Sequence, residues 1–230
     1  MLIYRRENEY IKLLSERSYS VNELADKLIV SEPTVRRDVL QLKQKELVTS
    51  HRGIVSLNGK SADQRIPIIV RDFENIEEKR RIAKIASSYI KDGDAIMLDA
   101  STTAYCLLPY LAQFRNLYVI TSGAKTAIAL ATMGIKTLCI GGEMILESFS
   151  YAGPDAESIL ENYHADVAFF SCRGLSENGI VTDNSILENN IRRIMIKNSK
   201  RQYLLCDKSN KGNVYLNTLC NIKDITKVIS

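Results

Sequence analysis

The sequence has few of the residues on which many enzymes and metalloproteins depend. It contains only two histidines, His51 and His164, and five cysteines, an odd number without the close spacing of metal-ligand pairs. We interpret the cysteines as reduced, structural thiols, and we expect no metal site and no cofactor. The histidines suit a surface or packing role better than metal ligation or catalysis.

Long apolar runs are also missing. No stretch of about twenty consecutive apolar residues occurs, and no secretory signal is recognisable. We therefore expect neither membrane insertion nor export, and we predict a cytoplasmic protein. With 230 residues and 45% hydrophobic content, the chain can form one small and one medium domain around real cores, so disorder is not expected.

The chain has almost no excess of charge of one sign, and its small positive excess is unevenly distributed along the sequence. The net charge is +4. Residues 1–60 carry 11 basic and 8 acidic side chains, whereas residues 61–230 carry 20 and 19. The basic excess therefore lies at the N-terminal end. Affinity for phosphate groups there would depend on clustering and dimerisation more than on total charge.

The N-terminal sixty residues predict three helices. The first covers about 3–16, and the second begins near Ser20, which forms a capping-box pattern with Glu23. The third begins at Ser31, a favourable N-cap, with Pro33 in its first turn. Its expected inward positions are Val35, Val39 and Leu42.

The tight connection at 29–30 between the second and third helices is typical of a helix-turn-helix. This geometry would present the adjacent Arg36 and Arg37 to a DNA groove. The strands expected at 47–50 and 54–57 indicate a wing, whose turn contains Gly53, a residue free to adopt positive φ. A lone arginine pair on a short helix is usually a solvated face. The three helices, the turn length and the basic wing together favour DNA binding.

Two segments, Ser20-Val21-Asn22-Glu23-Leu24-Ala25 and Val30-Ser31-Glu32-Pro33-Thr34-Val35-Arg36-Arg37-Asp38, resemble the N-terminal domain of DeoR-type transcriptional regulators. The resemblance implies a winged helix-turn-helix over residues 1–57 that binds double-stranded operator DNA in the major groove. The DNA-binding residues that it implies are Ser31, Glu32, Pro33, Thr34, Arg36, Arg37 and Arg52. The family usually has His-Gly-Gly-Ala in the wing, where this chain has His51-Arg52-Gly53-Ile54.

The periodic pattern lapses after the wing, which predicts a linker at 58–73 and a second domain over 74–230. The second domain opens with a helix at about 74–90, whose expected buried face comprises Ile82, Ile85, Ala86 and Tyr89. Apolar strands then alternate with helices, which favours an α/β domain with a largely parallel sheet and an α+β chain overall. The expected strands are 95–98, 118–120, 136–140, 167–170 and 202–206, and the expected helices are 103–112, 124–133 and 185–199.

Hydroxyl, glycine and charged residues follow these strands, at the edge where parallel sheets bind ligands. Each such motif alone is usually a cap or a turn, and their repetition after strands is what strengthens them. The turn 101–103 precedes a helix, whose free N–H groups favour a phosphate. Asp99 or Glu143 could accept hydrogen bonds from sugar hydroxyls. The candidate effector-binding residues are Asp99, Ser101, Thr102, Thr103, Thr121, Ser122, Gly141, Gly142, Glu143, Asp207, Lys208 and Lys211.

The segment from about Arg71 to Ile229 also resembles the DeoR-type sensor domain. The residues that carry this resemblance are Arg71, Glu78-Lys79, Asp99-Ala100-Ser101-Thr102-Thr103, Thr121-Ser122, Gly141-Gly142, Gly153, Gly174 and Asp207-Lys208-Ser209. It implies a fold similar to ribose-5-phosphate isomerase, a phosphorylated sugar or related metabolite as effector, and a homodimer or homotetramer. The family often has Asp-x-Ser-Lys at the last motif, so its lysine position holds Asn210 here.

Three function classes are compatible with these patterns. The favoured one is a repressor of a sugar or carbohydrate operon that a phosphorylated sugar releases from DNA. An isomerase-like enzyme with a DNA-binding domain could use Asp99, Glu143 or Asp207 as a general base. A repressor whose sensor domain only oligomerises is the third. Because fold does not confer chemistry, and because an enzyme leaves the DNA-reading domain unexplained, we predict a regulator and not an enzyme.

Overall fold

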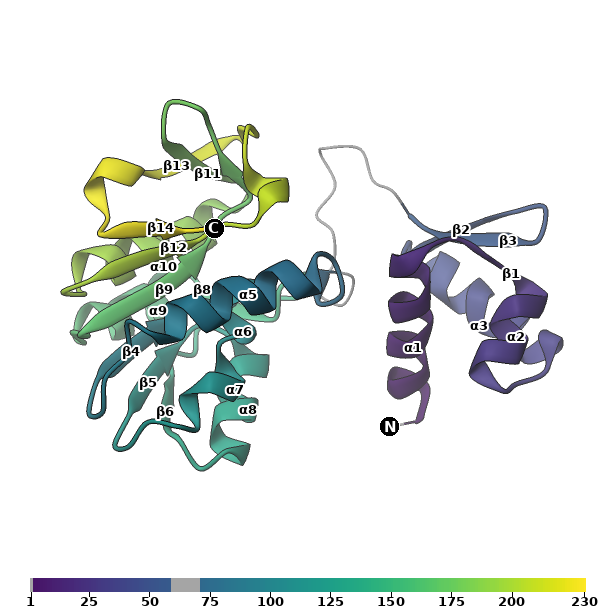
Figure 1. Cartoon of the computed structure of the whole chain (residues 1–230), viewed down its shortest axis with the longest axis horizontal. Helices are drawn as coiled ribbons and strands as arrows, with labels where there is room; N and C mark the ends of the chain where they lie inside the picture. The colour runs from purple at the N-terminus through teal and green to yellow at the C-terminus, as the bar shows by residue number, and fades with distance from the viewer. Residues whose placement is uncertain (1, 59–70) are drawn as a thin grey trace. The chain divides into compact units, whose positions relative to one another are not determined.

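The computed structural model describes residues 2–58 and 71–230 (Figure 1). Its contacts divide the chain into two compact units, Met1–Glu74 and Asn75–Ser230. Most of the linker that we predict at 58–73 lies outside the described residues.

The N-terminal unit combines three helices with a small antiparallel sheet of order β1-β3-β2. Its elements are α1 (Leu2–Glu16), β1 (Tyr19–Ser20), α2 (Val21–Leu28), α3 (Glu32–Gln44), β2 (Val48–His51) and β3 (Ile54–Leu57). The three inward positions expected on the third helix are buried, and they pack with residues of α1, α2 and the sheet. The expected helices and wing are therefore present, with the addition of the two-residue strand β1.

Capping fixes where α2 begins. The hydroxyl of Ser20 accepts the backbone N–H of Glu23 (3.2 Å), and the Glu23 carboxylate accepts the N–H of Ser20 (2.7 Å). This backbone bond, together with bonds from Arg17 and the Ser20 side chain, lowers the pKa of Glu23 to about 2. Ser31 occupies the N-cap of α3 as expected, but its hydroxyl bonds to the Thr34 hydroxyl (2.9 Å) and caps no backbone N–H.

The turn between α2 and α3 contains a strained residue. Ile29 follows the last turn of α2 in the left-handed conformation, with φ 55° and ψ 49°, and its side chain is 91% exposed. A β-branched residue is disfavoured there, because its Cβ lies too close to the following carbonyl oxygen. The conformation is held by backbone bonds from Ile29 and Val30 to the carbonyl of Ala25.

The C-terminal unit is built on a six-stranded sheet that is parallel throughout, in the order β14-β12-β9-β4-β5-β6. Its strands are β4 (Ala95–Leu98), β5 (Tyr118–Thr121), β6 (Lys136–Cys139), β9 (Val167–Ser171), β12 (Gln202–Leu205) and β14 (Lys227–Ile229). Its helices are α5 (Ile76–Ser87), α6 (Thr102–Tyr105), α7 (Leu108–Leu111), α8 (Ala124–Thr132), α9 (Pro154–Glu161) and α10 (Ile186–Lys197). The expected α/β architecture is confirmed.

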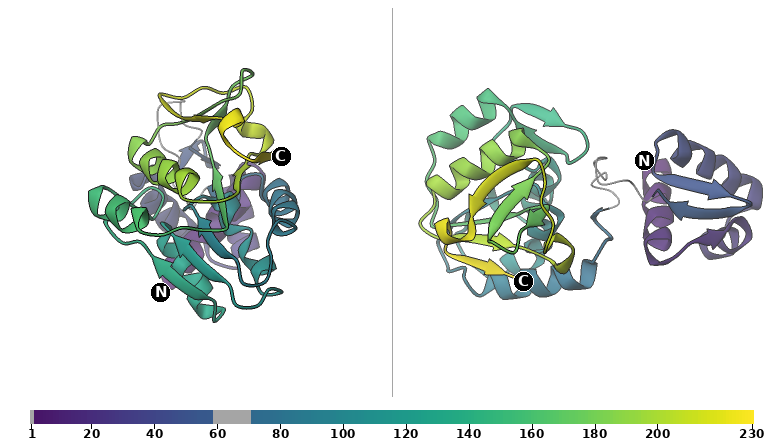
Figure 2. Two further views of the ribbon diagram at one scale, coloured as in Figure 1. Left: turned by 90° about the vertical axis from the view of Figure 1, so that its left-hand side faces the viewer. Right: turned by 90° about the horizontal axis from the view of Figure 1, so that it is seen from above.

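Helices cover both faces of this sheet, and Figure 2 shows α5 on one side and α9 with α10 on the other. Because side chains alternate along a strand, each strand contributes to two separate cores. Leu98, Val119 and Phe169 pack with α5 to α8, whereas Met97 and Phe170 pack with α9 and α10. Two-sided burial explains why these strands are almost continuously apolar in the sequence.

Smaller elements complete the unit. A two-stranded hairpin joins β7 (Glu143–Ile145) to β8 (Ser150–Ala152), and an antiparallel sheet has the order β10-β11-β13. The strands of that sheet are β10 (Gly174–Leu175), β11 (Ile180–Asp183) and β13 (Asn217–Asn221), and two 3-10 turns, η1 (Lys208–Asn210) and η2 (Ile222–Asp224), flank its last strand. No described helix has the length and apolar character needed to cross a membrane.

Two expectations about helices are wrong. The segment 103–112 is not one helix, because α6 and α7 have four residues each and are separated at 106–107, ahead of Pro109. Proline at the second position of α7 suits a helix start and cannot donate to the preceding turn. Ile85 of α5 is 39% exposed, because α5 packs on the sheet through Ile82, Ala83 and Ala86.

Candidate functional site

The third helix of the N-terminal unit, α3, presents two adjacent arginines to solvent. Val35, Val39 and Leu42 point into the core, which leaves Arg36 and Arg37 in solvent, with side chains 64% and 67% exposed. Their nearest carboxylates are weak partners, because Arg36 lies 3.5 Å from Glu32 and Arg37 lies 3.9 Å from Asp38. Exposed pairs of this kind are easily exchanged for another anion.

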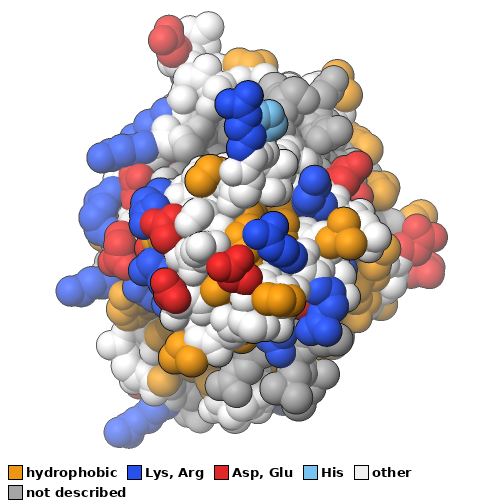
Figure 3. All heavy atoms as spheres, turned by 90° about the vertical axis from the view of Figure 1, so that its right-hand side faces the viewer, with side chains coloured by type: hydrophobic (Ala, Val, Ile, Leu, Met, Phe, Trp, Pro, Cys, Tyr) orange, Lys and Arg blue, Asp and Glu red, His pale blue; other side chains and the backbone are white. Residues whose placement is uncertain are grey.

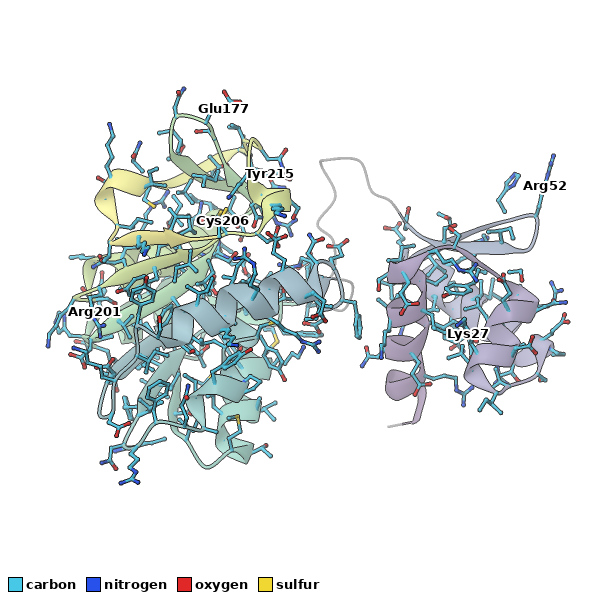
Figure 4. All side chains as sticks on the ribbon, viewed as in Figure 1. Lys27, Arg52, Glu177, Arg201, Cys206 and Tyr215 are labelled. Carbon is cyan, nitrogen blue, oxygen red and sulfur yellow. The ribbon has the colours of Figure 1, made fainter. Side chains whose placement is uncertain are left out.

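The hairpin between β2 and β3 carries the third expected cation. Arg52 and Gly53 have φ of 48° and 80°, the two left-handed positions of a tight hairpin turn. Figure 4 shows Arg52 at the tip of this hairpin, pointing away from the unit. Basic and acidic side chains are interspersed on the face that Figure 3 presents. Any DNA contact would therefore depend on placed arginines more than on one large positive patch.

The strand order of the six-stranded sheet reverses between β4 and β9, which is where a ligand crevice is expected. From β4 the chain proceeds through β5 to β6 on one side, and it later adds β9, β12 and β14 on the other side. Open parallel sheets bind ligands outside the carboxyl ends of the strands where the order reverses in this way. The turn 99–103 follows β4 directly, and residues 172–173 follow β9.

Asp99 ties these two strand-end loops together and is 2% exposed. One carboxylate oxygen accepts the N–H (3.1 Å) and hydroxyl (2.6 Å) of Ser101, and the other accepts the N–H of Ser171 (3.0 Å) and Nε of Arg192 (3.0 Å). The sequence suggested that Asp99 accepts sugar hydroxyls. The structure instead occupies both oxygens within the protein, which makes Asp99 a residue that positions the loops.

Arg192 of α10 sits at the centre of a buried ion-pair network. Its guanidinium bonds to Asp99 (3.0 Å) and to Asp183 (2.9 Å), and its side chain is 7% exposed. Burial alone would lower the pKa of Arg192, but the two aspartates outweigh it and raise that pKa above its ordinary value. Asp183 also accepts the backbone N–H groups of Asn184 (2.7 Å) and Ser185 (3.2 Å). The network joins β4, β11 and α10 at the crevice.

A small pocket opens next to this network. It is lined by Asp99, Ala100, Ser122, Tyr151, Glu188, Ile191 and Arg192. The β7–β8 hairpin closes over the end of β5, because Tyr151 donates its N–H to the Ser122 carbonyl (2.7 Å). Glu188 accepts the hydroxyl of Ser150 (3.0 Å). The structure therefore brings Asp99 and Ser122 together with a carboxylate that the sequence did not single out.

The turn of hydroxyl residues after β4 is present, but the helix that follows it is shorter than expected and so has a smaller dipole. Ser101, Thr102 and Thr103 are buried, and Ser101 caps α6 by accepting the N–H of Ala104 (3.1 Å). Because α6 has only four residues, its macrodipole contributes less than that of a long helix. Anion binding here would depend on hydroxyl and N–H groups. The hydroxyl of Thr121, at the end of β5, accepts the N–H of Gly123 (3.1 Å).

The turn after β6 has a structural explanation. Gly142 has φ 97°, and a Cβ placed there would lie 2.8 Å from the Ala152 carbonyl oxygen and 2.8 Å from the Ala156 Cβ. Close packing against Ala152 and the start of α9 is therefore sufficient to require glycine at this position. Gly141 has φ 67° with open space around it, and Glu143 is exposed on β7.

The polar side chains of the turn after β12 form hydrogen bonds within the turn. Asp207 is buried and accepts the N–H (2.8 Å) and hydroxyl (2.5 Å) of Ser209. Lys208 is exposed, and the ammonium of Lys211 donates to the hydroxyl of Ser230 (2.9 Å). Among the described residues, neither ammonium group makes a hydrogen bond or ion pair with the loops after β4 and β9, although the backbone of Lys211 pairs with Leu175.

Sequence reasoning missed four charged residues at this edge of the sheet. Asp183 is the last residue of β11 and Arg173 directly precedes β10, whereas Glu188 and Arg192 lie within the amphipathic helix α10. Only Arg173 carried a usable signal, because it follows the buried strand β9 in the same way that Asp99 follows β4.

Two family models match this chain. The DeoR-like helix-turn-helix domain matches residues 6–61, and the DeoR C terminal sensor domain matches residues 74–230. An uncharacterized HTH-type transcriptional regulator, YulB of Bacillus subtilis (strain 168), is 35% identical over all of this chain and 89% of its own length. A lactose phosphotransferase system repressor of Staphylococcus epidermidis (strain ATCC 35984) is 30% identical over 99% of this chain and 91% of its own.

Solved structures resemble parts of the chain. The eIF2B delta chain from Chaetomium thermophilum is similar over 66% of this chain and 55% of its own, with TM-score 0.51 and 17% identity. Ribose 5-phosphate isomerase A from Methanocaldococcus jannaschii aligns over 60% of this chain and 55% of its own, with TM-score 0.45 and 18% identity. At these identities a likeness concerns fold alone.

Proposed function

The chain belongs to the DeoR family of transcriptional regulators, and on that premise we propose that it represses a carbohydrate-metabolism operon until a phosphorylated sugar or related metabolite binds its sensor domain. The observation that carries the proposal is the match of both modules along one chain. A DNA-binding domain and a small-molecule sensor domain together make a regulator and not an enzyme. The family expected from the two sequence motifs is confirmed.

The proposed DNA contact is the exposed start of α3. Arg36 and Arg37 would contact phosphates or base edges in the major groove, and Arg52 would contact the backbone or minor groove from the wing. Ser31, Glu32, Pro33 and Thr34 form the first turn that approaches the DNA. Operator binding requires access to the chromosome, which supports the cytoplasm as the compartment of this protein.

The proposed effector site is the crevice between β4 and β9. Thr102 and Thr103 would donate hydrogen bonds to a phosphate, and Ser122, Tyr151 and Glu188 line the adjoining pocket, where sugar hydroxyls would bind. Asp99 is an unsuitable general base, because both its oxygens accept hydrogen bonds and one faces Arg192. This geometry supports ligand sensing over isomerase chemistry.

We propose that regulation is a population shift in a homodimer or homotetramer. Without effector, two winged helix-turn-helix units would be spaced to match two operator half-sites. Effector binding would favour an arrangement with another spacing, and its differential affinity for the two arrangements would set the response. The alternative in which the sensor domain only oligomerises predicts DNA binding without any response to sugar phosphates.

The experiment that tests this proposal is fluorescence anisotropy with a labelled fragment of the promoter next to the gene, at fixed salt. A panel of pentose and hexose phosphates is titrated into the complex, with the unphosphorylated sugars as controls. Release by one phosphorylated member is the expected result. Tight binding that no member of the panel affects would contradict the proposed sensing.

Thr102→Val is expected to raise the effector concentration for half-release of DNA by about 10-fold or more. A hydrogen bond to a charged group contributes about 1.5–3 kcal/mol, and valine keeps the shape but not the hydroxyl. DNA affinity without effector should not change. Thr132→Val, at the exposed end of α8, is the matched control. An unchanged effector response in Thr102→Val would show that the site is elsewhere.

Arg52→Gly is expected to have opposite effects on stability and on DNA binding. Glycine removes the cost of the left-handed conformation, so the free energy of unfolding should rise by about 0.5–1 kcal/mol after the larger unfolded-state entropy of glycine is included. DNA affinity should fall about fivefold through the loss of one exposed ion pair. Urea unfolding and anisotropy measure the two effects.

The control for this variant is Ile29→Asn. It relieves a left-handed residue of the same unit without removing a positive charge, so stability should rise while DNA affinity stays within twofold. A DNA affinity of Arg52→Gly equal to that of wild type would exclude Arg52 from the interface.

A further inference from the structure

Building on the proposed function, we infer that Arg173 supplies the positive charge that binds the phosphate of the effector, in place of a lysine of the 207–211 turn. Three observations point to Arg173. It lies at the crevice, its nearest carboxylate, Asp183, already has other hydrogen-bond donors, and the polar side chains of the turn after β12 bond to other parts of the protein.

The first observation is position. Arg173 lies two residues beyond β9, on the β9 side of the point where the strand order reverses. Ser171, the last residue of β9, donates its N–H to Asp99, and Asp99 in turn holds Ser101. The loop with Arg173 and the loop with the hydroxyl groups of 101–103 are therefore fastened to the same carboxylate. A phosphate bound by those hydroxyl groups would lie next to the loop that carries Arg173.

The second observation is that the guanidinium of Arg173 makes only a long ion pair, with Asp183. Its Nε lies 3.7 Å from the nearest oxygen of Asp183, beyond hydrogen-bond distance. Asp183 already accepts two backbone N–H groups and Arg192, so its charge is offset without Arg173. Within residues 2–58 and 71–230 the Arg173 side chain makes no hydrogen bond, and it is 21% exposed, which leaves it accessible to a ligand.

The third observation is what occupies the turn after β12. The side chain of Asn210 bonds to the backbone through both its oxygen and its nitrogen. The amide oxygen accepts the N–H of Asp207 (3.1 Å), and the amide nitrogen donates to the carbonyl of Arg173 (3.2 Å). Lys211 bonds to Ser230 instead. The Asn210 side chain thus lies against the backbone of Arg173, so positions 173 and 210 are neighbours in the structure.

Arginine suits this role chemically. Its planar guanidinium can donate two parallel hydrogen bonds to two phosphate oxygens, and it stays charged at any physiological pH. Loss of such a pair should weaken binding of the anion by about 10- to 100-fold, because hydrogen bonds to charged groups contribute about 1.5–3 kcal/mol each.

The test compares full-length wild type, Arg173→Met, Arg173→Lys and Lys197→Met. Lys197 lies exposed in the last turn of α10, so its variant removes one positive charge away from the crevice. Titration calorimetry measures binding of inorganic phosphate and of the sugar phosphate that releases DNA, at matched ionic strength. Arg173→Met should weaken both by about 10- to 100-fold, Arg173→Lys by less, and Lys197→Met by under twofold. Binding of the unphosphorylated sugar should be equal in all four proteins.

A double variant tests whether a cation at position 210 can replace the one at position 173. Arg173→Met combined with Asn210→Lys should regain part of the lost phosphate affinity, which a merely structural role of Arg173 would not allow. Unchanged phosphate affinity in a folded Arg173→Met protein overturns the inference, as does an equal loss in Lys208→Met or Lys211→Met.

Failure of the proposed function gives a different result. Wild type would then still bind inorganic phosphate through Arg173, but no sugar phosphate of the panel would release the protein from DNA. Absence of phosphate binding by wild type overturns the assignment of Arg173 itself.

Discussion

Arg192→Met is expected to lower the free energy of unfolding of the C-terminal unit by about 3–5 kcal/mol, the usual result of removing one partner from a buried ionic network. Two carboxylates, Asp99 and Asp183, would stay buried without a counter-charge. Methionine fills a similar volume, so the loss would come from charge and not from a cavity. Urea unfolding followed by circular dichroism measures it.

Arg193→Met is the matched control for this prediction. Arg193 is the next residue of α10 and bonds to Asn190 (2.8 Å) and to the Thr218 carbonyl, but it is only partly buried. Its loss should cost under about 1 kcal/mol, because partly exposed polar contacts contribute little. Adding Asp99→Asn and Asp183→Asn to Arg192→Met should restore part of the stability, since the buried charges then disappear together. A cost under 1 kcal/mol for Arg192→Met alone would contradict the importance of the network.

The double variant Arg36→Ala with Arg37→Ala is expected to weaken DNA binding by at least about 30-fold, and by more if both arginines contact base edges. Each such contact contributes about 1–3 kcal/mol, and neither side chain supports the fold. Thermal stability should be unchanged, because the partners Glu32 and Asp38 are at 3.5 Å and 3.9 Å on an exposed face. Anisotropy at several salt concentrations measures the loss.

The salt series separates two kinds of contact. An arginine on a phosphate contributes to the dependence of affinity on salt, so its loss should reduce that slope by about one. An arginine on a base edge should instead relax the preference for operator over unrelated DNA. Lys12→Ala, which removes an exposed charge from α1, should change neither. Equal losses in Lys12→Ala and in the arginine variants would indicate a non-specific charge effect.

The sequence predicts the helix-turn-helix well because its signals are local. The capping box at Ser20 and Glu23, the proline at 33 and the period of Val35, Val39 and Leu42 each act within a few residues. The strands of the sensor domain are equally clear, because burial on both faces makes them continuously apolar. The break between α6 and α7 had a local signal as well in Pro109, which the apolar pattern of 103–112 outweighed.

The crevice is only partly predictable, because its parts are distant in the chain. The rule that ligands bind at strand ends selects Asp99 and Ser122. The rule does not predict that both carboxylate oxygens of Asp99 accept hydrogen bonds from Ser101, Ser171 and Arg192, because those bonds join residues up to 93 positions apart. Arg192 and Glu188 were missed because a charged residue within an amphipathic helix looks like a solvated position. Gly142 was assigned to a ligand for a similar reason, since its collision partners at 152 and 156 are not adjacent in sequence.

Asp99 holds the loops in place, and other residues are proposed to contact the ligand. This separation has a consequence for how regulators of this kind can diverge. The ionic network of Asp99, Asp183 and Arg192 fixes the loops from inside the protein, whereas Thr102, Ser122 and Arg173, which are proposed to touch the ligand, follow three separate strands. A duplicated gene could therefore exchange one loop at a time and acquire a new inducer while its scaffold stays intact. Transplanting the 171–174 segment between two paralogues would exchange the response to the anionic part of the inducer without exchanging the rest of its specificity.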